Sequence, residues 1–597
     1  MYSCDIPHIH SASITTMAGG LLRHLHRCSS AVQPVLEGAM SLVCWVSKAY
    51  ALHQVTERVA RSRRALRYSA GQVWGRAVAA RLDPPRLHTA YFVAISCVGW
   101  GLLAAVEVRA PDSRPRGIDM FFTAVSAVTT SSMSTVEMEV FSNGQLLVLT
   151  ALMLMGGEVF VSLLCLASKW SKLRRQIINR SQRVESHDND VDLETTPAAA
   201  ATGTEAAPAA VADDDSRSIP IAANTTVAEE EYYDNSRRAP AADAKMLRRN
   251  ALRSLFYIVL AILVVVHAVG IVAVRAYISW APGARQTLRR KALSAWTFAV
   301  FTTVSTFSGC GFMPTNENMM VFSRDVPLQL LLVPQMLMGN TLFPPLLAAC
   351  VWAAAAATRR EELVEMARNR KGREATGFYH LLPARRCWML AGTAACFVAV
   401  QAVLVCAMEW GGALQGLRAG EKVWSALFLA VNSRHTGEST LDFSTLAPAI
   451  IVLFVLMMYL PPYTTWFPFE ENPTTKDHSR ASQGMRLLKS TVLSQLSYLT
   501  IAVIAICITE RTKLKEDPIN FNVFSIVVEV VSAYGNVGFS MGYSCSRQIN
   551  PDQLCTDRWT GFAGRWSNSG KLILIFVMFF GRLKKFSMKG GKAWKLS

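Results

Sequence analysis

The chain has 597 residues, of which 51% are apolar and only 17% are charged. Lys and Arg number 61 against 43 Asp and Glu, a formal net charge of +18, and mean hydropathy is positive at +0.24. A purely soluble protein of this size is difficult to reconcile with these values. The composition therefore predicts a polytopic membrane protein. The positive charge fits the flanks of membrane segments, so we expect a lipid bilayer around the chain and no nucleic-acid partner.

Apolar segments of membrane length recur along the chain, since about 20 helical residues cross the hydrocarbon core. They lie at 90–106, 145–168, 255–278, 328–357, 387–408, 446–460 and 492–509. An eighth segment, at 571–586, is weaker because its uninterrupted apolar part is short. We predict eight transmembrane helices in an all-α fold.

A short motif recurs four times between these segments. The copies lie at 125–132, 304–311, 430–437 and 531–538, and they end in Ser132, Gly311, Gly437 and Gly538. Each follows an apolar stretch too short to cross the membrane, which predicts a re-entrant segment that lines a cavity or is buried in protein. Four units of helix, pore loop and helix predict a pseudo-fourfold array around one pore, the architecture of a cation channel.

The predicted domains follow these repeats. Repeats are expected at 86–168, 248–357, 387–465 and 487–597, with an N-terminal cytoplasmic extension at 1–85 and cytoplasmic linkers at 169–247, 358–386 and 466–486. The first linker is rich in Ala, Thr, Pro and acidic residues, so we expect it to be largely disordered. Lys and Arg cluster on one side if eight helices cross, which places both termini in the cytoplasm.

The third loop departs from the other three. It lacks a serine six places before its glycine, and it carries Arg434, His435 and Glu438. We expect these side chains to form a buried ion pair that braces the loop and not to touch the permeating ion.

The last helix carries two cations, Lys571 and Arg582. They are eleven residues apart, so in a helix they lie within roughly 20° of one face and about 16 Å apart along the axis. Intramembrane cations usually face a cavity or a partner, and we expect Arg582 to lie below the loops as an electrostatic barrier, with Lys571 on the same face. Glu158 is a candidate counter-charge for Arg582. The alternative is that each cation reaches its nearest membrane interface.

The cysteines and histidines argue against catalysis. Thirteen cysteines show no metal-ligand spacing, although Cys545 and Cys555 share a predicted outer segment and could form a disulfide. Only His267 lies within a span, with no neighbouring carboxylate to orient it, so no enzyme and no cofactor are predicted. A membrane receptor or scaffold without transport would leave the four loops unexplained.

Four longer strings resemble the plant HKT transporters of the Trk/Ktr/HKT superfamily of potassium and sodium translocators. They are 308–319 (SGCGFMPTNENM), 431–438 (VNSRHTGE), 532–539 (SAYGNVGF) and 581–586 (GRLKKF). The resemblance covers about 86–597 and implies four M1-P-M2 units, a tendency to form homodimers and a filter at Ser132, Gly311, Gly437 and Gly538. It also implies an intramembrane gate near Pro461 and Pro462, where the proline pair must end a helix; a simple helix terminus is the alternative.

Glycine suits a filter position whatever the family, because it adopts unusual backbone angles readily and leaves room beside the ion. Ser132 adds a side chain near the axis. In the resembled family, serine in the first loop accompanies sodium-selective members and glycine accompanies potassium-permeable ones. We therefore predict passive transport of Na⁺, held at the four filter positions, across the plasma membrane. A Na⁺/K⁺ symporter or a K⁺-permeable transporter of the same fold is the alternative.

Overall fold

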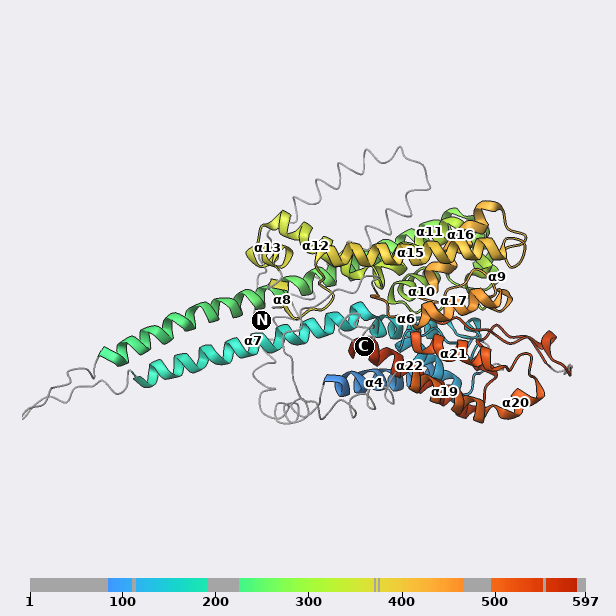
Figure 1. Ribbon diagram of the computed structural model, residues 1–597, viewed down its shortest axis with the longest axis horizontal. Coiled ribbons are helices and arrows are strands. Elements are labelled where there is room, and N and C mark those ends of the chain that lie inside the picture. Colours follow the sequence, from blue (N-terminus) through green and yellow to red (C-terminus); the bar gives the residue numbers. More distant parts are fainter. Residues whose placement is uncertain are drawn as a thin grey trace, which may run out of the picture. The chain divides into compact units, whose positions relative to one another are not determined.

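The structure, a computed structural model, is built from helices throughout the residues it describes (Figure 1). These residues are 84–109, 114–191, 225–369, 372–373, 376–464, 495–550 and 555–587. Nearly all of them belong to the compact unit Leu87–Ser597. The predicted extension at 1–85, except its last two residues, and the predicted linker at 466–486 lie outside the described residues.

The helices fall into four consecutive groups that match the four predicted repeats. Group A contains α4 (Pro84–Ala105), α5 (Gly117–Val128), α6 (Asn143–Gly156) and α7 (Glu158–Val191). Group B contains α8 (Thr225–Trp280), α9 (Pro282–Arg290), α10 (Ala295–Ser308), α11 (Val326–Gly339), α12 (Phe343–Thr358) and α13 (Glu361–Arg368). Group C contains α15 (Ala384–Glu409), α16 (Ala419–Asn432) and α17 (Pro448–Tyr459). Group D contains α19 (Gln495–Thr509), α20 (Arg511–Glu516), α21 (Val523–Gly535) and α22 (Asn568–Ser587).

Two of the predicted spans are bent pairs of helices. The span predicted at 145–168 bends by 56° between α6 and α7, at Gly157, and the span predicted at 328–357 bends by 80° between α11 and α12. Pro344, in the first turn of α12, suits a helix start because it has no amide hydrogen to leave unpaired. Both breaks follow the matching Leu-Met-Gly strings of the two segments, so the same local sequence produces the same interruption.

The described helices give fewer clear spans than the eight that were predicted. By length and composition three of them can cross a membrane, in 87–105, 245–280 and 384–409, and the two bent pairs raise the number to five. The remaining apolar helices are shorter. For example, α17 has 12 residues because Pro461 and Pro462 follow its end, and α19 has 15 described residues.

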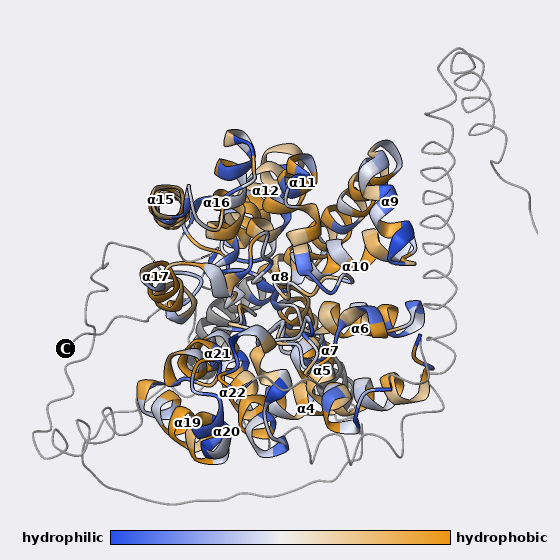
Figure 2. Ribbon diagram, turned by 90° about the vertical axis from the view of Figure 1, so that its right-hand side faces the viewer, coloured by the Kyte–Doolittle hydropathy of each residue, from blue (hydrophilic) through white to orange (hydrophobic). Residues whose placement is uncertain are grey.

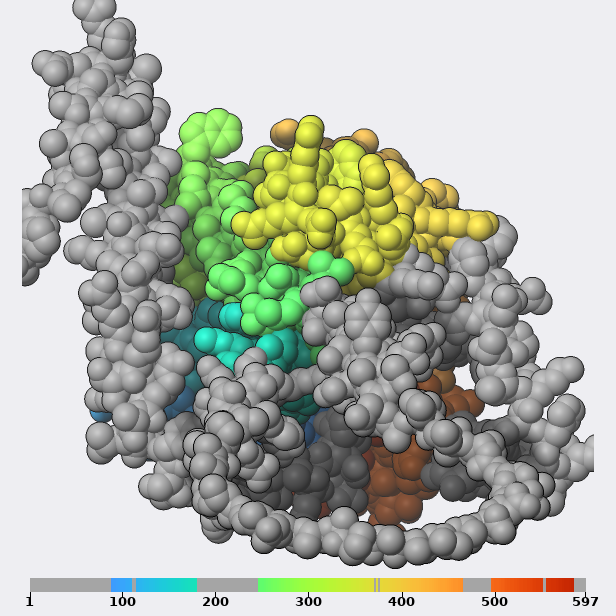
Figure 3. Space-filling model, turned by 90° about the vertical axis from the view of Figure 1, so that its left-hand side faces the viewer, coloured from blue at the N-terminus to red at the C-terminus, as the bar shows by residue number. Residues whose placement is uncertain are grey.

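Helices extend into both ends of the first predicted linker, and its middle, 192–224, lies outside the described residues. Helix α7 continues beyond its apolar part to Val191, and α8 begins at Thr225. The two helices pack side by side (Figure 1). At the same end of the molecule α13 packs against both α8 and α12, and Figure 3 shows green residues of α8 next to yellow residues that follow them in the chain.

Four short central helices, α5, α10, α16 and α21, organise the rest of the fold. Each packs against the helix that follows the central loop of the preceding group: α10 against α6, α16 against α11, α21 against α17, and α5 against α22. This pattern returns to its starting point, so the four groups close into a ring, as Figure 2 shows by their arrangement around a common centre. The last turns of the central helices are almost fully buried.

Glycines allow three of the groups to pack tightly. A Cβ atom on Gly156, Gly339 or Gly581 would collide with the backbone carbonyl at the end of the central helix of the same group, at Val128, Phe307 and Tyr534 respectively. Each of these glycines lies in or at the end of the helix that follows the loop. Backbone contacts of this kind exclude any larger residue.

A buried ion pair closes the ring between groups D and A. The Lys571 Nζ atom lies 2.7 Å from Asp119 Oδ1, and the two side chains are only 5% and 12% exposed. Lys571 belongs to α22 and Asp119 to α5. The charge of Lys571 is therefore neutralised at a helix contact, a different place from the pore-facing position that the sequence suggested.

A second ionic contact joins groups A and B on the loop side of the central helices. Lys291 Nζ lies 2.6 Å from Glu139 and 2.5 Å from Glu317. Partial burial lowers the pKa of Lys291, but the hydrogen bonds to the two carboxylates outweigh burial, so the pKa is raised. Lys291 therefore keeps its charge over the physiological pH range.

The variant Lys571→Met is expected to lower the free energy of unfolding by about 3–5 kcal/mol, because it leaves the buried Asp119 carboxylate without its partner. The double variant Lys571→Met/Asp119→Asn removes both charges and is expected to recover much of that loss. Thermal unfolding of the detergent-purified protein measures both. Equal stability of wild type and the single variant would contradict a structural role for the pair.

Candidate functional site

The four predicted filter positions share one backbone conformation. Ser132, Gly311, Gly437 and Gly538 have φ angles of 53°, 87°, 69° and 109°. They lie in the turns after the central helices, which we call loop A (129–133), loop B (309–313), loop C (433–438) and loop D (536–540). Left-handed angles are natural for glycine but cost about 1–2 kcal/mol for other residues. Ser132 therefore adopts a glycine-like turn at an energetic cost.

The four loops contact one another in order. A Cβ atom on Gly311 would collide with the Thr436 carbonyl of loop C, and one on Gly437 would collide with the Val537 carbonyl of loop D. A Cβ atom on Gly538 would collide with the Ser132 side chain of loop A. The Cys310 thiol of loop B in turn hydrogen-bonds with the Ser132 backbone. The loops thus form a closed ring, and its members come from all four groups.

The central helices hold the loops by equivalent hydrogen bonds. In each loop one amide donates to a carbonyl five residues earlier: Ser131 to Ser126, Cys310 to Ser305, Gly437 to Asn432 and Val537 to Ser532, at 2.8–3.2 Å. Side chains of the helix ends add a second support. Ser126 Oγ accepts from the Met133 amide at 2.8 Å, and Ser532 Oγ accepts from the Gly538 amide at 3.0 Å.

Loop C receives the same support from a different residue. It lacks the serine, and Asn432 Oδ1 instead accepts from the Glu438 amide at 3.2 Å. The backbone bond to Asn432 is shifted by one residue relative to the other loops. Loop C therefore reaches the same filter angle by a turn of different register, which explains why its sequence departs from the others.

The charged residues of loop C brace it without pairing with each other. Arg434 Nη2 donates to the Pro461 carbonyl at 2.8 Å, His435 Nε2 lies 2.8 Å from Thr341 Oγ1, and Glu438 Oε1 accepts from Thr306 at 2.8 Å. Among the described residues no ion pair joins Arg434 to Glu438, so the expected ion pair is corrected to bonds with neighbouring elements. Each side chain is tied to a separate segment, because the loop lies between groups B and C.

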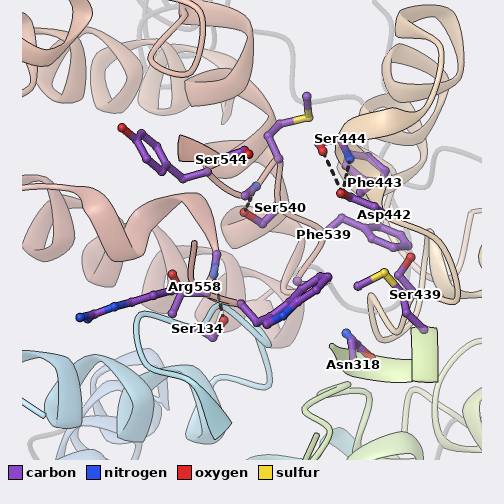
Figure 4. A pocket seen from close by; sticks show the side chains of 18 of the residues that line it. Ser134, Asn318, Ser439, Asp442, Phe443, Ser444, Phe539, Ser540, Ser544 and Arg558 are labelled. Atoms are coloured by element: carbon purple, nitrogen blue, oxygen red, sulfur yellow. Dashed lines mark hydrogen bonds between the residues drawn. The ribbon is translucent and has the colours of Figure 1, made fainter. Parts of the chain in front are cut away.

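A cavity of about 270 Å³ lies against the ring of loops, among the chain segments that follow the loops. Its lining includes Ser132, Gly437 and Gly538, and Figure 4 shows walls from all four groups, with Ser134, Asn318, Ser439 and Ser540 as one polar side chain from each. Hydroxyl and amide oxygens are suitable partners for a partly hydrated cation. The lining also includes Asp442, Arg547 and Arg558.

A disulfide closes part of this cavity wall. Cys545 and Cys555 are joined, and the residues on both sides of the bridge, from Ser544 to Arg547 and from Arg558 to Gly561, contribute to the lining. The Cys545 amide also donates to Asp557 Oδ1 at 2.7 Å. The bridge therefore ties the two parts of the segment that face the cavity.

The proline pair and the residue that follows it bond to residues of groups A, B and C. Pro461 accepts from Arg434, and the Pro462 carbonyl accepts from Thr341 of group B at 3.4 Å. The next residue, Tyr463, donates to Glu158 of group A at 3.0 Å. Residues 461–464 are therefore held by hydrogen bonds to other groups of helices.

Arg582 of group D reaches the same region. Its side chain is 3% exposed, and it donates to the Gly156 carbonyl at the break between α6 and α7. It also interacts electrostatically with Glu158 and Tyr463. Glu158, the candidate counter-charge, therefore lies near Arg582 and between it and the proline segment.

Several residues that contribute to the site were not identified from the sequence pattern. Asn432 and Asn536 lie within the recurring motif but differ from its other copies, and Tyr463 follows the proline pair. His380, whose Nε2 atom lies 2.9 Å from Ser162 Oγ and 3.8 Å from Glu158, comes from a segment predicted to be a cytoplasmic linker. Among these residues, Asn536 gave a sequence signal, because it stands in loop D where loop B has Gly309. Asparagine, like glycine, tolerates the left-handed turn.

Comparison with known proteins shows the family of the chain. Residues 230–589 match the family model TrkH, described as a cation transport protein. The chain is 72% identical to a probable cation transporter HKT1;4 of Oryza sativa subsp. japonica, over 86% of this chain and 97% of the relative. It is 43% identical to the sodium transporter HKT1 of Arabidopsis thaliana, over 82% and 92%. A solved structure of the potassium transporter TrkH from Vibrio parahaemolyticus aligns with a TM-score of 0.45 and 14% identity, over 96% and 94%.

These relationships define the class of the protein as an integral membrane protein that transports cations. The chain belongs to the TrkH cation transport family and, within the Trk/Ktr/HKT superfamily, is related to the HKT cation transporters. Membership of a transporter family also means that the protein is not an enzyme.

The variant Gly538→Ala is expected to abolish most of the transport current, because its Cβ atom would meet the Ser132 side chain in a loop that cannot move aside. Current is measured relative to the amount of protein at the cell surface. Gly416→Ala is the matched control: Gly416 also has a left-handed angle, φ 86°, but has open space around it. Equal losses in both variants would attribute the effect to backbone strain alone and contradict the close contact of loops A and D.

Proposed function

We propose that the protein is a sodium-selective passive pore whose filter consists of Ser132, Gly311, Gly437 and Gly538. One observation carries this proposal: Ser132 adopts the left-handed angle that glycine adopts in the other three loops, and it does so inside the ring of loops. Its side chain therefore lies against Gly538 of loop D, whereas at the other three positions the neighbouring loop leaves no room for a Cβ atom. The sodium transporter HKT1 among the relatives supports the same ion.

The serine favours the smaller cation for a physical reason. Backbone carbonyls replace the hydration shell of an ion in a filter, and the fit depends on how closely and how firmly they surround it. A side chain between loops A and D reduces the space at one corner and offers a hydroxyl as a further ligand. Both effects disfavour K⁺, which needs a wider ring of oxygens.

We further propose that the chain forms four M1-P-M2 repeats with eight membrane crossings. The crossings would be α4, the α6–α7 pair, α8, the α11–α12 pair, α15, α17, α19 and α22. This arrangement puts the basic residues in the polar part of α7 and the basic segments after α12 and α22 on one face, which favours cytoplasmic termini. We propose the plasma membrane as the location. A homodimer remains part of the proposal on family resemblance alone.

The gate of the proposed pore is the segment at Pro461 and Pro462. Its bonds to groups A, B and C beneath the loops support this assignment, because a segment that crosses the axis has to contact several groups at once. Arg582, beside it, would add a positive charge that opposes cation flow. Tyr463 and Glu158 would hold the segment in place until the bonds break.

Voltage clamp on oocytes that express the chain tests the selectivity. We expect the reversal potential of wild type to follow Na⁺ and not K⁺. In Ser132→Gly we expect added K⁺ permeability, with the reversal potential moving by about 59 mV for each tenfold change in the permeability ratio. A wild-type current carried equally by K⁺ would refute the sodium assignment, and coupled movement of both ions at a fixed ratio would favour a symporter.

The variant Arg582→Gln tests the electrostatic barrier. We expect it to increase the cation current at equal surface amounts, roughly tenfold for each 1.4 kcal/mol by which the barrier falls. Lys584→Gln removes a charge from the same helix two residues later and serves as the control. A current that is unchanged in Arg582→Gln, or raised equally in both variants, would contradict the barrier.

A further inference from the structure

A directed chain of hydrogen bonds links loop D to loop A, beside the filter serine Ser132. Asn536 Nδ2 donates to Ser131 Oγ at 2.8 Å, and Ser131 Oγ lies 2.8 Å from Thr129 Oγ1. The Thr129 hydroxyl donates to the Val125 carbonyl at 2.7 Å. A hydroxyl has one hydrogen. Because Thr129 uses its hydrogen on Val125, Ser131 must be the donor in the bond between the two hydroxyls.

This chain of hydrogen bonds, which we call the relay, is shielded from water and connects loop D, loop A and α22. Asn536 is 1% exposed, and Ser131 and Thr129 are fully buried. Asn536 Nδ2 also lies 3.2 Å from the Met578 carbonyl of α22, which fixes the amide against the helix that follows loop D. Buried bonds of this kind are costly to break, since no water replaces them.

The relay supports loop A, the loop whose filter position is not a glycine. Ser131 immediately precedes Ser132, whose angle is unfavourable for a residue with a side chain. In loop B the residue that corresponds to Asn536 is Gly309, which has no side chain to donate. The relay is therefore specific to the contact between loops A and D, where the Ser132 side chain lies against Gly538.

We propose that Asn536, Ser131 and Thr129 are positioning residues that hold the Ser132 turn in its filter conformation, so that selectivity depends on them although they do not touch the ion. This inference rests on the proposed sodium filter. Without the relay the Ser132 turn can relax toward ordinary angles, which moves its carbonyl and hydroxyl relative to the other three positions.

Reversal potentials in Na⁺ and K⁺ baths test the selectivity role. We expect Thr129→Val, which keeps the shape and removes the hydroxyl, and Ser131→Ala to raise the K⁺/Na⁺ permeability ratio in the direction of Ser132→Gly. Thr129→Ser keeps the hydroxyl and is expected to retain the wild-type ratio. Ser308→Ala is a matched control, because Ser308 is a buried serine at the end of α10 that donates within its own turn, to the Ser305 carbonyl at 3.1 Å.

The outcomes separate this inference from the function on which it rests. If Ser132→Gly changes the ratio and the two hydroxyl-deficient variants do not, the positioning role is wrong and the sodium filter stands. If wild type and Ser132→Gly have the same ratio, the sodium filter is wrong and the selectivity role falls with it.

The relay itself has a test that does not depend on selectivity. In the detergent-purified protein, Ser131→Ala/Asn536→Ala is expected to melt no lower than Asn536→Ala alone, because each single change already breaks the same chain. Melting-temperature losses that simply add would show that the two residues act independently, and would overturn the relay.

Discussion

The close approach of four backbone turns is the constraint on which the rest of the structure depends. In three of the loops the space beside the filter glycine is occupied by the neighbouring loop, so Gly311, Gly437 and Gly538 leave no room for a Cβ atom. Turns in this conformation do not attract each other on their own. They stay together because the central helices that carry them are packed in a closed cycle, each against the group before it.

Backbone symmetry in this protein is greater than side-chain symmetry. The four loops share left-handed filter angles and a five-residue backbone hydrogen bond, but they reach them with different residues. Asn432 replaces a serine in loop C, and Ser132 replaces a glycine in loop A. The ring tolerates one serine because its neighbour in loop D is a glycine. In the proposed filter an ion would meet a similar backbone geometry with an uneven lining, which is a basis for discrimination between cations.

The helix breaks beneath the ring connect the filter to the proposed gate. Where α6 and α7 separate, Gly156 offers its carbonyl to Arg582 and Glu158 binds Tyr463. Arg434 extends from loop C to Pro461. A movement of the proline segment has to break the bond between Arg434 and Pro461, so in the proposed function the gate and the filter loop are coupled. Continuous helices would have left no free carbonyls for these bonds.

The sequence by itself determined the local features of the molecule: the apolar segments, the recurrent motif and the small residues at its end. It also placed Cys545 and Cys555 in one segment, close enough to pair. These features depend on neighbours along the chain, such as helix length, the proline pair and the backbone freedom of glycine. For this reason the four recurring positions could be located from spacing, and the resemblance to a family proposed their role as a filter.

Only the tertiary structure decided which distant groups meet. Lys571 pairs with Asp119, 452 residues away, and the charged side chains of loop C bind separate elements instead of each other. The relay from Asn536 to Ser131 spans 405 residues. Such contacts arise from the way the four groups close into a ring. Periodicity and composition describe one segment at a time and carry no information about its partners.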